Sequence, residues 1–179
     1  MNIFFASDHH FHHQNILNFT REDGSPLRVF KDVDHMNEYM VYKHNLRVKP
    51  SDKVYFLGDV TMARNAKSLE ILARMNGEKI LIKGNHDLCK PEQYLQYFKD
   101  VRACHQFDGM ILSHIPIHEE SLGRWGVNVH GHLHANRVMR RGFNGKPIEP
   151  DSRYFCVCME QLDDYTPISL EEVKKYTKC

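Results

Sequence analysis

Short apolar runs, each followed at once by polar residues, recur along the 179-residue chain. They are rich in β-branched and aromatic residues, a composition typical of buried strands. The predicted strands cover residues 3–6, 54–57, 80–82, 110–112, 127–129 and 154–157.

Longer stretches in which apolar residues recur at helical spacing separate several of these runs. They predict helices over residues 34–46, 66–75, 91–98 and 169–176. Strand and helix alternate at first, and strands dominate later. This order indicates an α/β protein with a mixed, layered sheet architecture rather than an all-α or all-β one.

A single domain spanning residues 1–179 is predicted from size and composition. A chain of 21.1 kDa with 41% hydrophobic residues can bury one good core but is short for two. The polar segments 21–26 and 140–147 contain Gly and Pro, which is typical of surface turns. The second segment is expected to join two hairpin-like strands, and neither is an interdomain linker.

Charge and cysteine content narrow the class of protein. The chain has 24 Lys and Arg against 23 Asp and Glu, which argues against a general electrostatic attraction to nucleic acid or to an anionic membrane. Five cysteines without framework spacing are expected to be reduced thiols in a cytoplasmic protein. The first residues lack a signal-peptide pattern, and no segment approaches the ~20 apolar residues of a membrane span.

Metal-ligand residue types follow five of the predicted strands, in a chain that contains 13 histidines. The carboxyl ends of strands in α/β sheets are where loops converge on ligands. Residues separated by one position in an extended segment point to the same side, so two such residues can reach one ion. The candidate ligands are Asp8, His10, Asp59, Asn85, His114, His132 and His134.

Taken singly, these motifs have simpler explanations. Asp8 could be a capping residue beside exposed histidines, and Gly58-Asp59 is ordinary turn chemistry. The segment His132-x-His134 is more specific, because two histidines flank one apolar residue directly after a strand. Five such motifs in succession favour a metal site over coincidence.

The ordered motifs closely resemble those of the calcineurin-like metallophosphoesterases, especially small single-domain bacterial and phage members. They are Asp8-x-His10, Gly58-Asp59, Gly84-Asn85-His86-Asp87, Ser113-His114 and Gly131-His132-x-His134. The resemblance spans nearly the whole chain. It implies a four-layer α/β/β/α sandwich with two mixed β-sheets and a dinuclear metal site at the strand tips. The chain departs from the commoner motif at His9 and His12, which could contact substrate or face solvent.

The resemblance also implies a role for each candidate ligand. Asp8, His10 and His134 would hold one divalent cation, and Asn85, His114 and His132 would hold the second. Asp59 would bridge the two cations, because its two oxygens can serve two ions. This ligand set contains no thiolate and suits Mn²⁺ best, with Fe²⁺, Ni²⁺ or Zn²⁺ as alternatives.

Two cations can provide a nucleophile at neutral pH and neutralise charge on a phosphate ester, so metal-dependent hydrolysis of phosphate esters is predicted. His86 follows a predicted ligand directly and is the candidate to protonate the leaving-group oxygen. Asp87 could orient His86 or a ligand, or cap a helix.

The sequence also offers candidate residues for substrate recognition. Arg21 and Arg28 follow the first motif, where a guanidinium could bind a second phosphate. The other candidates for substrate binding are His13, Asn45 and His118. The expected partner is a phosphodiester of nucleotide type or a nucleic-acid end. The alternatives are a phosphomonoesterase acting on a small metabolite and a non-catalytic scaffold of the same fold.

Overall fold

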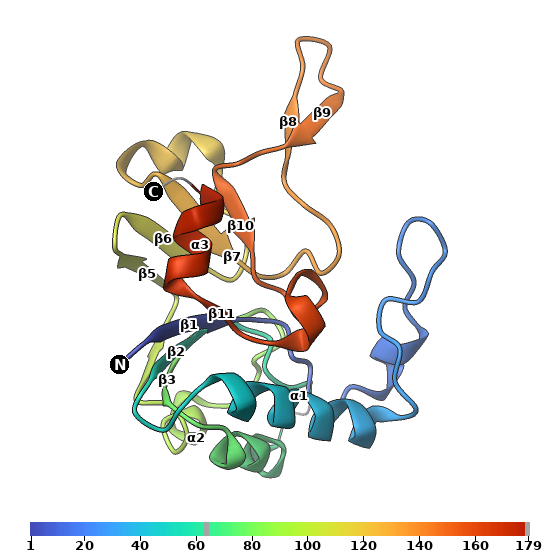
Figure 1. The fold of residues 1–179 in the computed structure, drawn as a ribbon, viewed down its shortest axis with the longest axis vertical. Coiled ribbons are helices and arrows are strands. Elements are labelled where there is room, and N and C mark those ends of the chain that lie inside the picture. Colours follow the sequence, from blue (N-terminus) through green and yellow to red (C-terminus); the bar gives the residue numbers. More distant parts are fainter. Residues whose placement is uncertain (63–64, 178–179) are drawn as a thin grey trace.

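The computed structural model describes residues 1–62 and 65–177. Its first sheet has five strands in the order β11-β1-β2-β3-β4 (Figure 1). Strands β1 to β4 run parallel to one another, and β11 pairs antiparallel with β1. The strands are β1 (Ile3–Ala6), β2 (Lys53–Phe56), β3 (Glu78–Ile82), β4 (Asp100–Arg102) and β11 (Ile168–Ser169).

The second sheet has the order β10-β7-β6-β5, in which β5 alone pairs antiparallel with its neighbour among the described strands. Its strands are β5 (Cys104–Phe107), β6 (Met110–Ser113), β7 (Val127–His130) and β10 (Tyr154–Cys156). A separate antiparallel hairpin, β8 (Met139–Arg141) and β9 (Pro147–Pro150), projects from the body of the molecule (Figure 1).

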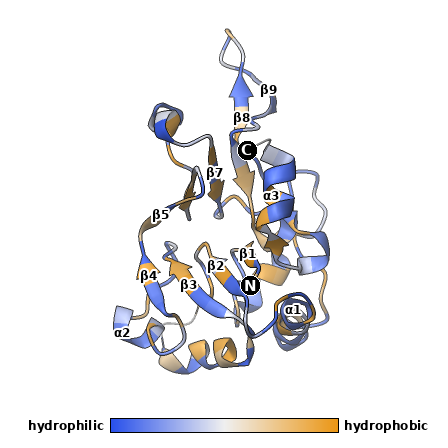
Figure 2. Cartoon of the chain, turned by 60° about the vertical axis from the view of Figure 1, so that its left-hand side comes forward, coloured by the Kyte–Doolittle hydropathy of each residue, from blue (hydrophilic) through white to orange (hydrophobic). Residues whose placement is uncertain are grey.

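Helices cover the first sheet on the side away from the second (Figures 1 and 2). The longest, α1, begins after Asp32, whose carboxylate accepts a hydrogen bond of 2.7 Å from the His35 backbone N–H. Helix α3 contacts β1, β10 and β11, so it lies against both sheets. The helical elements are α1 (Val33–Arg47), α2 (Pro91–Tyr94), α3 (Leu170–Thr177) and the 3-10 helices η1 (Gln14–Asn18), η2 (Ala66–Arg74), η3 (Glu119–Arg124), η4 (Met159–Gln161) and η5 (Asp163–Tyr165).

The hydrophobic core has two layers, because neighbouring residues of a strand point to opposite faces of the sheet. Phe5 and Tyr55 stack with ring centroids 5.8 Å apart, and both rings contact Phe107 of the second sheet. Phe56 points the other way and packs against His44 of α1. Figure 2 shows the hydrophobic colours concentrated along the strands of both sheets. The sheets are therefore held together by aromatic packing between their inner faces.

The predicted α/β class with two mixed sheets is confirmed, and all six predicted strands are present close to their predicted bounds. Two helical predictions need correction. The segment 66–75 forms the 3-10 helix η2 rather than an α-helix. Helix α2 ends at Tyr94 instead of residue 98. The chain joins the first sheet soon afterwards, where the backbone N–H of Lys99 donates to the Lys79 carbonyl at 2.8 Å.

Strands β4, β5 and β11 were not predicted, and β8 and β9 were expected only as hairpin-like segments beside the turn at 140–147. Each lies at a sheet edge or in the projecting hairpin, and each is partly or fully exposed. Edge strands need no continuous apolar run, so they give little signal in the sequence. The predicted turn at 140–147 does join two strands, β8 and β9.

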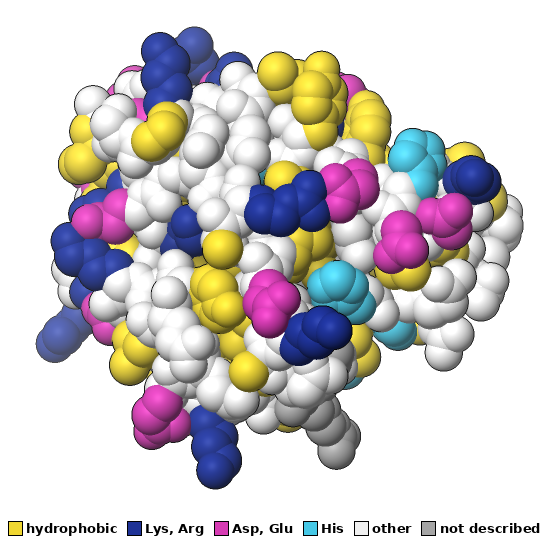
Figure 3. Space-filling model, turned by 90° about the horizontal axis from the view of Figure 1, so that it is seen from below, with side chains coloured by type: hydrophobic (Ala, Val, Ile, Leu, Met, Phe, Trp, Pro, Cys, Tyr) yellow, Lys and Arg dark blue, Asp and Glu magenta, His cyan; other side chains and the backbone are white. Residues whose placement is uncertain are grey.

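On the face shown in Figure 3, Lys and Arg side chains are interspersed with Asp and Glu, so this face carries charges of both signs. This agrees with the formal net charge of +1. None of the helices in the described part of the chain has the length and apolar character needed to cross a bilayer.

Candidate metal centre

The carboxyl ends of five parallel strands, three from the first sheet and two from the second, meet at one place. The backbone N–H of Asp8 donates to the Gly58 carbonyl at 3.0 Å, which joins the tips of β1 and β2. The backbone N–H of His132 donates to Asp8 Oδ2 at 2.9 Å, which joins the two sheets. Residues that are more than 120 positions apart in sequence are thus brought into contact, as the strand-end pattern predicted.

Asp8 and Asp59 lie at the middle of this region, and both are buried. Each carboxylate is fixed by a backbone donor through one oxygen. Asp8 Oδ2 accepts from His132, and Asp59 Oδ1 accepts from the His86 backbone N–H at 2.8 Å. Asp8 Oδ1 is buried without a hydrogen-bond partner among the described residues. Such an oxygen needs a proton or a cation, because an unpaired buried charge is costly.

Two imidazoles face that unpaired oxygen. His10 Nε2 lies 3.6 Å and His134 Nε2 lies 3.8 Å from Asp8 Oδ1. Ligand atoms of these three residues all lie within 4.8 Å of one another, close enough to surround one ion. Both ring nitrogens of His10 are buried and lack a hydrogen-bond partner in the described chain.

A second group shares Asp8 and adds Asp59 and His114, again with ligand atoms within 4.8 Å of one another. His114 Nε2 lies 3.3 Å from Asp59 Oδ2 and 2.8 Å from Asn85 Oδ1. The same Asn85 oxygen lies 3.1 Å from His132 Nδ1. All seven residues predicted as ligands are therefore linked in one cluster.

Asp59 reaches imidazoles of both groups. Its Oδ2 lies 3.3 Å from His114 Nε2 and 3.7 Å from His10 Nε2. Asp8 is also common to the two groups. Two neighbouring ion sites with shared carboxylates are therefore compatible with this geometry.

The electrostatics of the cluster favour positive charge. Burial alone would raise the pKa of Asp8, but the adjacent His10 imidazole and the charges of His114 and His134 outweigh it and hold that pKa well below its usual range. Burial would lower the pKa of His114, yet Asp59, Asp8 and the Leu57 carbonyl together raise it to about 9. The carboxylates thus favour a positive charge between them. In the metal-free protein, protonated His114 provides that charge.

Five of the seven cluster residues have a left-handed backbone conformation. Their φ angles are 58° at Asp8, 51° at His10, 52° at Asp59, 70° at His132 and 50° at His134. Non-glycine residues rarely adopt positive φ, although Asp, Asn and His do so more readily than others. Such conformations concentrate at functional sites, where the surrounding structure enforces them.

Glycine is required where two of the turns pass the carboxylates. A Cβ on Gly131 would collide with the Asp8 carboxylate and would lie 2.6 Å from Ser7 Oγ. A Cβ on Gly84 would collide with the Asp59 carboxylate. The glycines of the predicted motifs therefore allow close approach of neighbouring strand tips.

The structure adds a buried ion pair that sequence reasoning missed. Glu160 Oε1 lies 3.0 Å from His134 Nδ1 and 2.7 Å from Arg28 Nε. Arg28 also donates to the backbone carbonyls of Asp8 and His9. A carboxylate on the far nitrogen of a metal-ligating histidine fixes the ring's tautomer and orientation. The position of Glu160 just beyond the last predicted strand was the only signal for it in the sequence.

Asp87 does not cap a helix. Its carboxylate accepts from the backbone N–H groups of Asp59, Val60 and Gly84 at 2.8, 3.0 and 2.8 Å. Burial raises the pKa of this carboxyl to about 6. Asp87 therefore holds the tips of β2 and β3 together behind the cluster.

Two further histidines border the cluster. The His86 ring centroid lies 5.6 Å from that of His10, and its side chain makes no hydrogen bond within the described chain. His13 lies at the same centroid distance from His10. Burial, with the nearby charges of His10 and His86, lowers the pKa of His13 to about 4, so this ring is neutral at pH 7.

Arg28 is not placed to bind substrate, contrary to the prediction. Its side chain is fully buried, because its guanidinium is engaged by Glu160 and by backbone carbonyls. Arg21 remains on a half-buried turn, where its backbone N–H donates to the Ser25 carbonyl at 2.8 Å.

Asn45 and His118 have local structural partners. Asn45 donates to the Arg74 carbonyl and accepts from the Asn76 backbone N–H, both at 2.8 Å. His118 Nδ1 accepts from the Glu120 backbone N–H at 3.3 Å and so caps η3. These contacts account for both side chains without a substrate.

His9 and His12, at which the chain departs from the commoner motif, have different surroundings. His9 is buried, and its ring packs against Phe11 and Phe56. His12 is exposed, and its backbone N–H and Nδ1 both contact the Asn37 side chain. His9 therefore belongs to the core, and His12 to the surface beside α1.

Comparison with known proteins gives relatives without established functions. No family model matches the sequence. The crystal structure of the protein of unknown function AQ665 from Aquifex aeolicus is similar, with 31% identity, a TM-score of 0.66, and coverage of 97% of this chain and 98% of that one. A structure from Streptococcus pneumoniae TIGR4, described as a predicted phosphoesterase, has 13% identity and a TM-score of 0.36, with coverage of 88% of this chain and 70% of that one. It is too distant to support an inference.

The uncharacterized protein MJ1445 of Methanocaldococcus jannaschii is a relative by sequence. The two are 32% identical over 177 residues, which cover 97% of this chain and 89% of the relative. Similarity at this level over nearly the full length of both proteins reflects common descent. The chain therefore belongs to the family of the Methanocaldococcus jannaschii protein MJ1445.

Proposed function

We propose that the chain is a metal-dependent phosphoesterase of the calcineurin-like metallophosphoesterase class, with a site for two divalent cations. One observation carries this proposal. The buried carboxylates of Asp8 and Asp59 each have one oxygen held by a backbone N–H and the other turned toward imidazole nitrogens from neighbouring strand tips. Buried carboxylate oxygens and imidazoles arranged in this way are suited to bind a transition-metal ion.

The residues present fit the proposed ions. Asp8, His10 and His134 would hold one cation, and Asn85, His114 and His132 the other, with Asp59 between them. Mn²⁺ is the proposed metal because carboxylate and amide oxygens suit it, and Fe²⁺, Ni²⁺ and Zn²⁺ are the alternatives, since imidazole suits them. When bound, a pair of divalent cations supplies a nucleophile at neutral pH and neutralises charge on phosphoryl oxygens.

The exposure of the cluster indicates where a substrate enters. Asp8, His10, Asp59 and His114 are buried, whereas Asn85 is exposed and His86, His132 and His134 are partly exposed. A phosphate ester would therefore approach from the side of Asn85 and His132. His86 is partly exposed and its ring lies beside that of His10, so we propose that its imidazole donates a proton to the leaving-group oxygen.

The proposed substrate is a phosphodiester of nucleotide type, and a phosphomonoester is the alternative. The substrate-binding candidates support neither choice, since Arg28, Asn45 and His118 are engaged within the protein. Turnover of bis(p-nitrophenyl) phosphate against p-nitrophenyl phosphate, with Mn²⁺ added, would decide between the two classes.

Two variants test the assignment directly. Asp59→Asn is expected to abolish hydrolysis and to weaken cation binding, because one shared carboxylate loses its charge. His86→Ala is expected to retain cation binding but to lower kcat by about 10²–10⁴, the usual contribution of a general acid. His35→Ala, an exposed histidine on α1, is the matched control and should keep full activity.

Circular dichroism would establish that each variant is folded. Undiminished turnover in folded Asp59→Asn and His86→Ala would refute the assignment. Binding of two Mn²⁺ ions without turnover of diesters, monoesters, cyclic nucleotides or RNA ends would instead favour a non-catalytic scaffold.

A further inference from the structure

Two cysteines at the end of β10 form a close thiol pair. The Sγ atoms of Cys156 and Cys158 lie 3.3 Å apart. Cys156 is partly exposed, whereas Cys158 is completely buried. Both are free thiols. The pair therefore joins a thiol that solvent can reach to one that it cannot.

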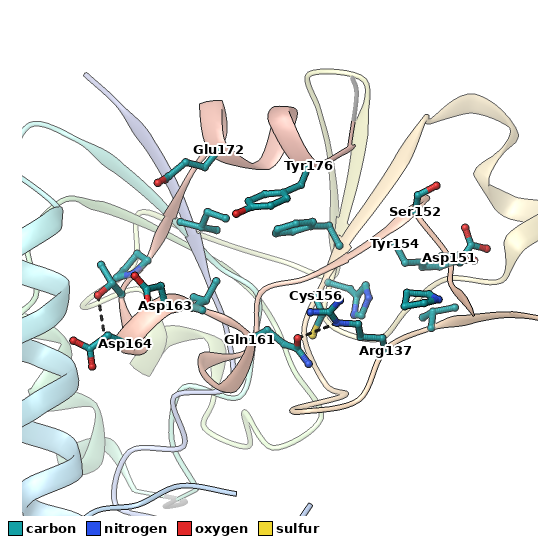
Figure 4. Close-up of a pocket in the computed structure, with 18 of the residues that line it drawn as sticks. Arg137, Asp151, Ser152, Tyr154, Cys156, Gln161, Asp163, Asp164, Glu172 and Tyr176 are labelled. Atoms are coloured by element: carbon teal, nitrogen blue, oxygen red, sulfur yellow. Dashed lines mark hydrogen bonds between the residues drawn. The ribbon is translucent and has the colours of Figure 1, made fainter. Parts of the chain in front are cut away.

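Cys156 lines a cavity of about 790 Å³ between β10, α3 and the base of the β8–β9 hairpin. Figure 4 shows its sulfur near Arg137 and Gln161, with Tyr154 and Tyr176 among the other lining side chains. None of the seven proposed metal ligands lines this cavity. A small molecule can therefore reach Cys156 through a route separate from the proposed substrate entrance.

Cys158 connects the pair to the metal cluster. Its Sγ donates to Asp8 Oδ2 at 3.1 Å and accepts from the His134 backbone N–H at 3.2 Å. The residue between the cysteines is also tied to this region, since the Val157 carbonyl accepts from the Ser7 backbone N–H at 2.9 Å. Movement of residues 156–158 would therefore be transmitted to Asp8 and His134.

We propose that Cys156 and Cys158 are a modification site at which a hydroperoxide forms a disulfide, and that this disulfide weakens cation binding. Cys156 sulfur attacks the peroxide, the O–O bond breaks, and a sulfenic acid and water form. Cys158 sulfur then attacks Cys156 sulfur, the S–O bond breaks, and a second water leaves. Overall, two thiols lose two electrons and two protons, and one hydrogen peroxide is reduced to two waters.

Forming the disulfide must change the contacts of Cys158. The sulfur atoms have to move from 3.3 Å to about 2.05 Å apart. The oxidised Cys158 sulfur carries no hydrogen and cannot donate to Asp8. Loss of a partner behind a metal ligand typically weakens metal affinity 10–100-fold. This effect on affinity rests on the proposed metal site, whereas formation of the disulfide does not.

Peptide mapping tests the disulfide. The metal-free full-length protein would be treated with hydrogen peroxide, freed of peroxide, alkylated and digested with trypsin. The peptide 154–174 contains both cysteines and is expected to be lighter by two hydrogens and unalkylated. Dithiothreitol should restore alkylation. Full alkylation of this peptide, at a peroxide dose that oxidises the exposed Cys104, would overturn the proposal.

Titration with Mn²⁺ tests the coupling. Oxidised protein is expected to bind Mn²⁺ at least tenfold more weakly than reduced protein. Cys156→Ser should keep the affinity of the reduced protein and lose its response to peroxide, while Cys104→Ser should keep the response. Unchanged affinity after disulfide formation would contradict the coupling. Absence of Mn²⁺ binding in the reduced protein would contradict the proposed function but leave the peptide result to decide on the disulfide.

Discussion

His134 is held from behind by a chain of charged groups. Glu160 contacts its Nδ1, and Arg28 contacts Glu160, with both charged side chains fully buried. Arg28 also binds the backbone carbonyl of Asp8. Two proposed ligands of one cation are therefore positioned by the same buried ion pair. Removing one partner of such a pair leaves an uncompensated buried charge.

Substitution of Glu160 should affect both metal binding and stability. Glu160→Ala is expected to weaken Mn²⁺ binding 10–100-fold, because His134 loses the partner that orients it. The free energy of unfolding should fall by about 3–5 kcal/mol, because Arg28 is left unpaired. Calorimetric titration and urea unfolding would measure the two effects.

Two further variants provide the comparison. Glu160→Gln keeps an acceptor for His134 and should show a smaller loss of Mn²⁺ affinity. Glu149→Ala removes an exposed carboxylate that pairs with Arg140, and it should change neither quantity appreciably. Wild-type affinity and stability in Glu160→Ala would show that the ion pair has no positioning role.

The protonation of His114 predicts how cation binding depends on pH. Burial opposes the charge, but Asp59 and Asp8 raise the pKa of this imidazole to about 9 in the metal-free protein. A cation requires the neutral ring, so binding at pH 7.5 should release a proton and affinity should rise toward pH 9. Titrations in buffers of different ionisation enthalpy would count the protons. Binding without proton release would contradict the expected displacement.

The raised pKa of His114 also makes the stability of the metal-free protein depend on pH. The folded pKa of about 9 lies above the ordinary value of 6.5. The imidazolium therefore stabilises the metal-free fold fully below pH 6.5, and this contribution is lost as the pH rises toward 9.

At the residue scale, the sequence predicted which ligand types are present but not how they are held. Asp8, Asp59 and His114 were recognisable because each follows an apolar run. Their backbone strain, the ion pair behind His134 and the contacts of Asp87 depend on segments far apart in sequence. Glu160 and Arg28, for example, are 132 positions apart.

At the scale of strands and turns, the cluster depends on how closely neighbouring tips approach. The turn after β7 passes the Asp8 carboxylate with no room for a side chain at Gly131. Gly131 does not have positive φ, so its replacement by alanine tests space and not backbone conformation.

Gly131→Ala should separate the tips of β1 and β7. We expect Mn²⁺ affinity to fall at least tenfold, because Asp8 must move, and stability to fall by about 1–3 kcal/mol, the usual cost of overpacking. Gly123→Ala is the matched control, because a Cβ there has no neighbour within 4 Å. Metal titration and thermal unfolding of both variants would reveal the difference. Equal behaviour of the two proteins would show that close approach at Gly131 is unimportant.

Interior strands were more predictable than edges. Strands β1, β2 and β6 are nearly continuous apolar runs because they are buried on both faces. Strand β7 is also fully buried, although Asn128 and His130 alternate with its two valines. Strand β5 alternates exposed and half-buried residues, and β4 is half-buried throughout, so neither gave an apolar run. Pairing with a neighbouring strand, rather than the local hydrophobic pattern, determines these edge strands.

For the whole molecule, the proposed function depends on how the two sheets pack. Asp8 and Asp59 come from the first sheet, and His114 and His132 come from the second. Aromatic contacts of Phe107 with Phe5 and Tyr55 hold the inner faces together. The sequence predicted the layered class, but the site exists only once this packing brings both sets of strand tips to one place.

Anomalous diffraction from a crystal soaked in Mn²⁺ would test the central claim most directly. We expect two anomalous peaks about 3.5–4 Å apart, the usual spacing in two-metal sites, one near His10 and His134 and the other near His114 and His132. Both should lie beside Asp59. A fully occupied soak with no peak at these carboxylates, or with a single peak bound elsewhere, would contradict the account.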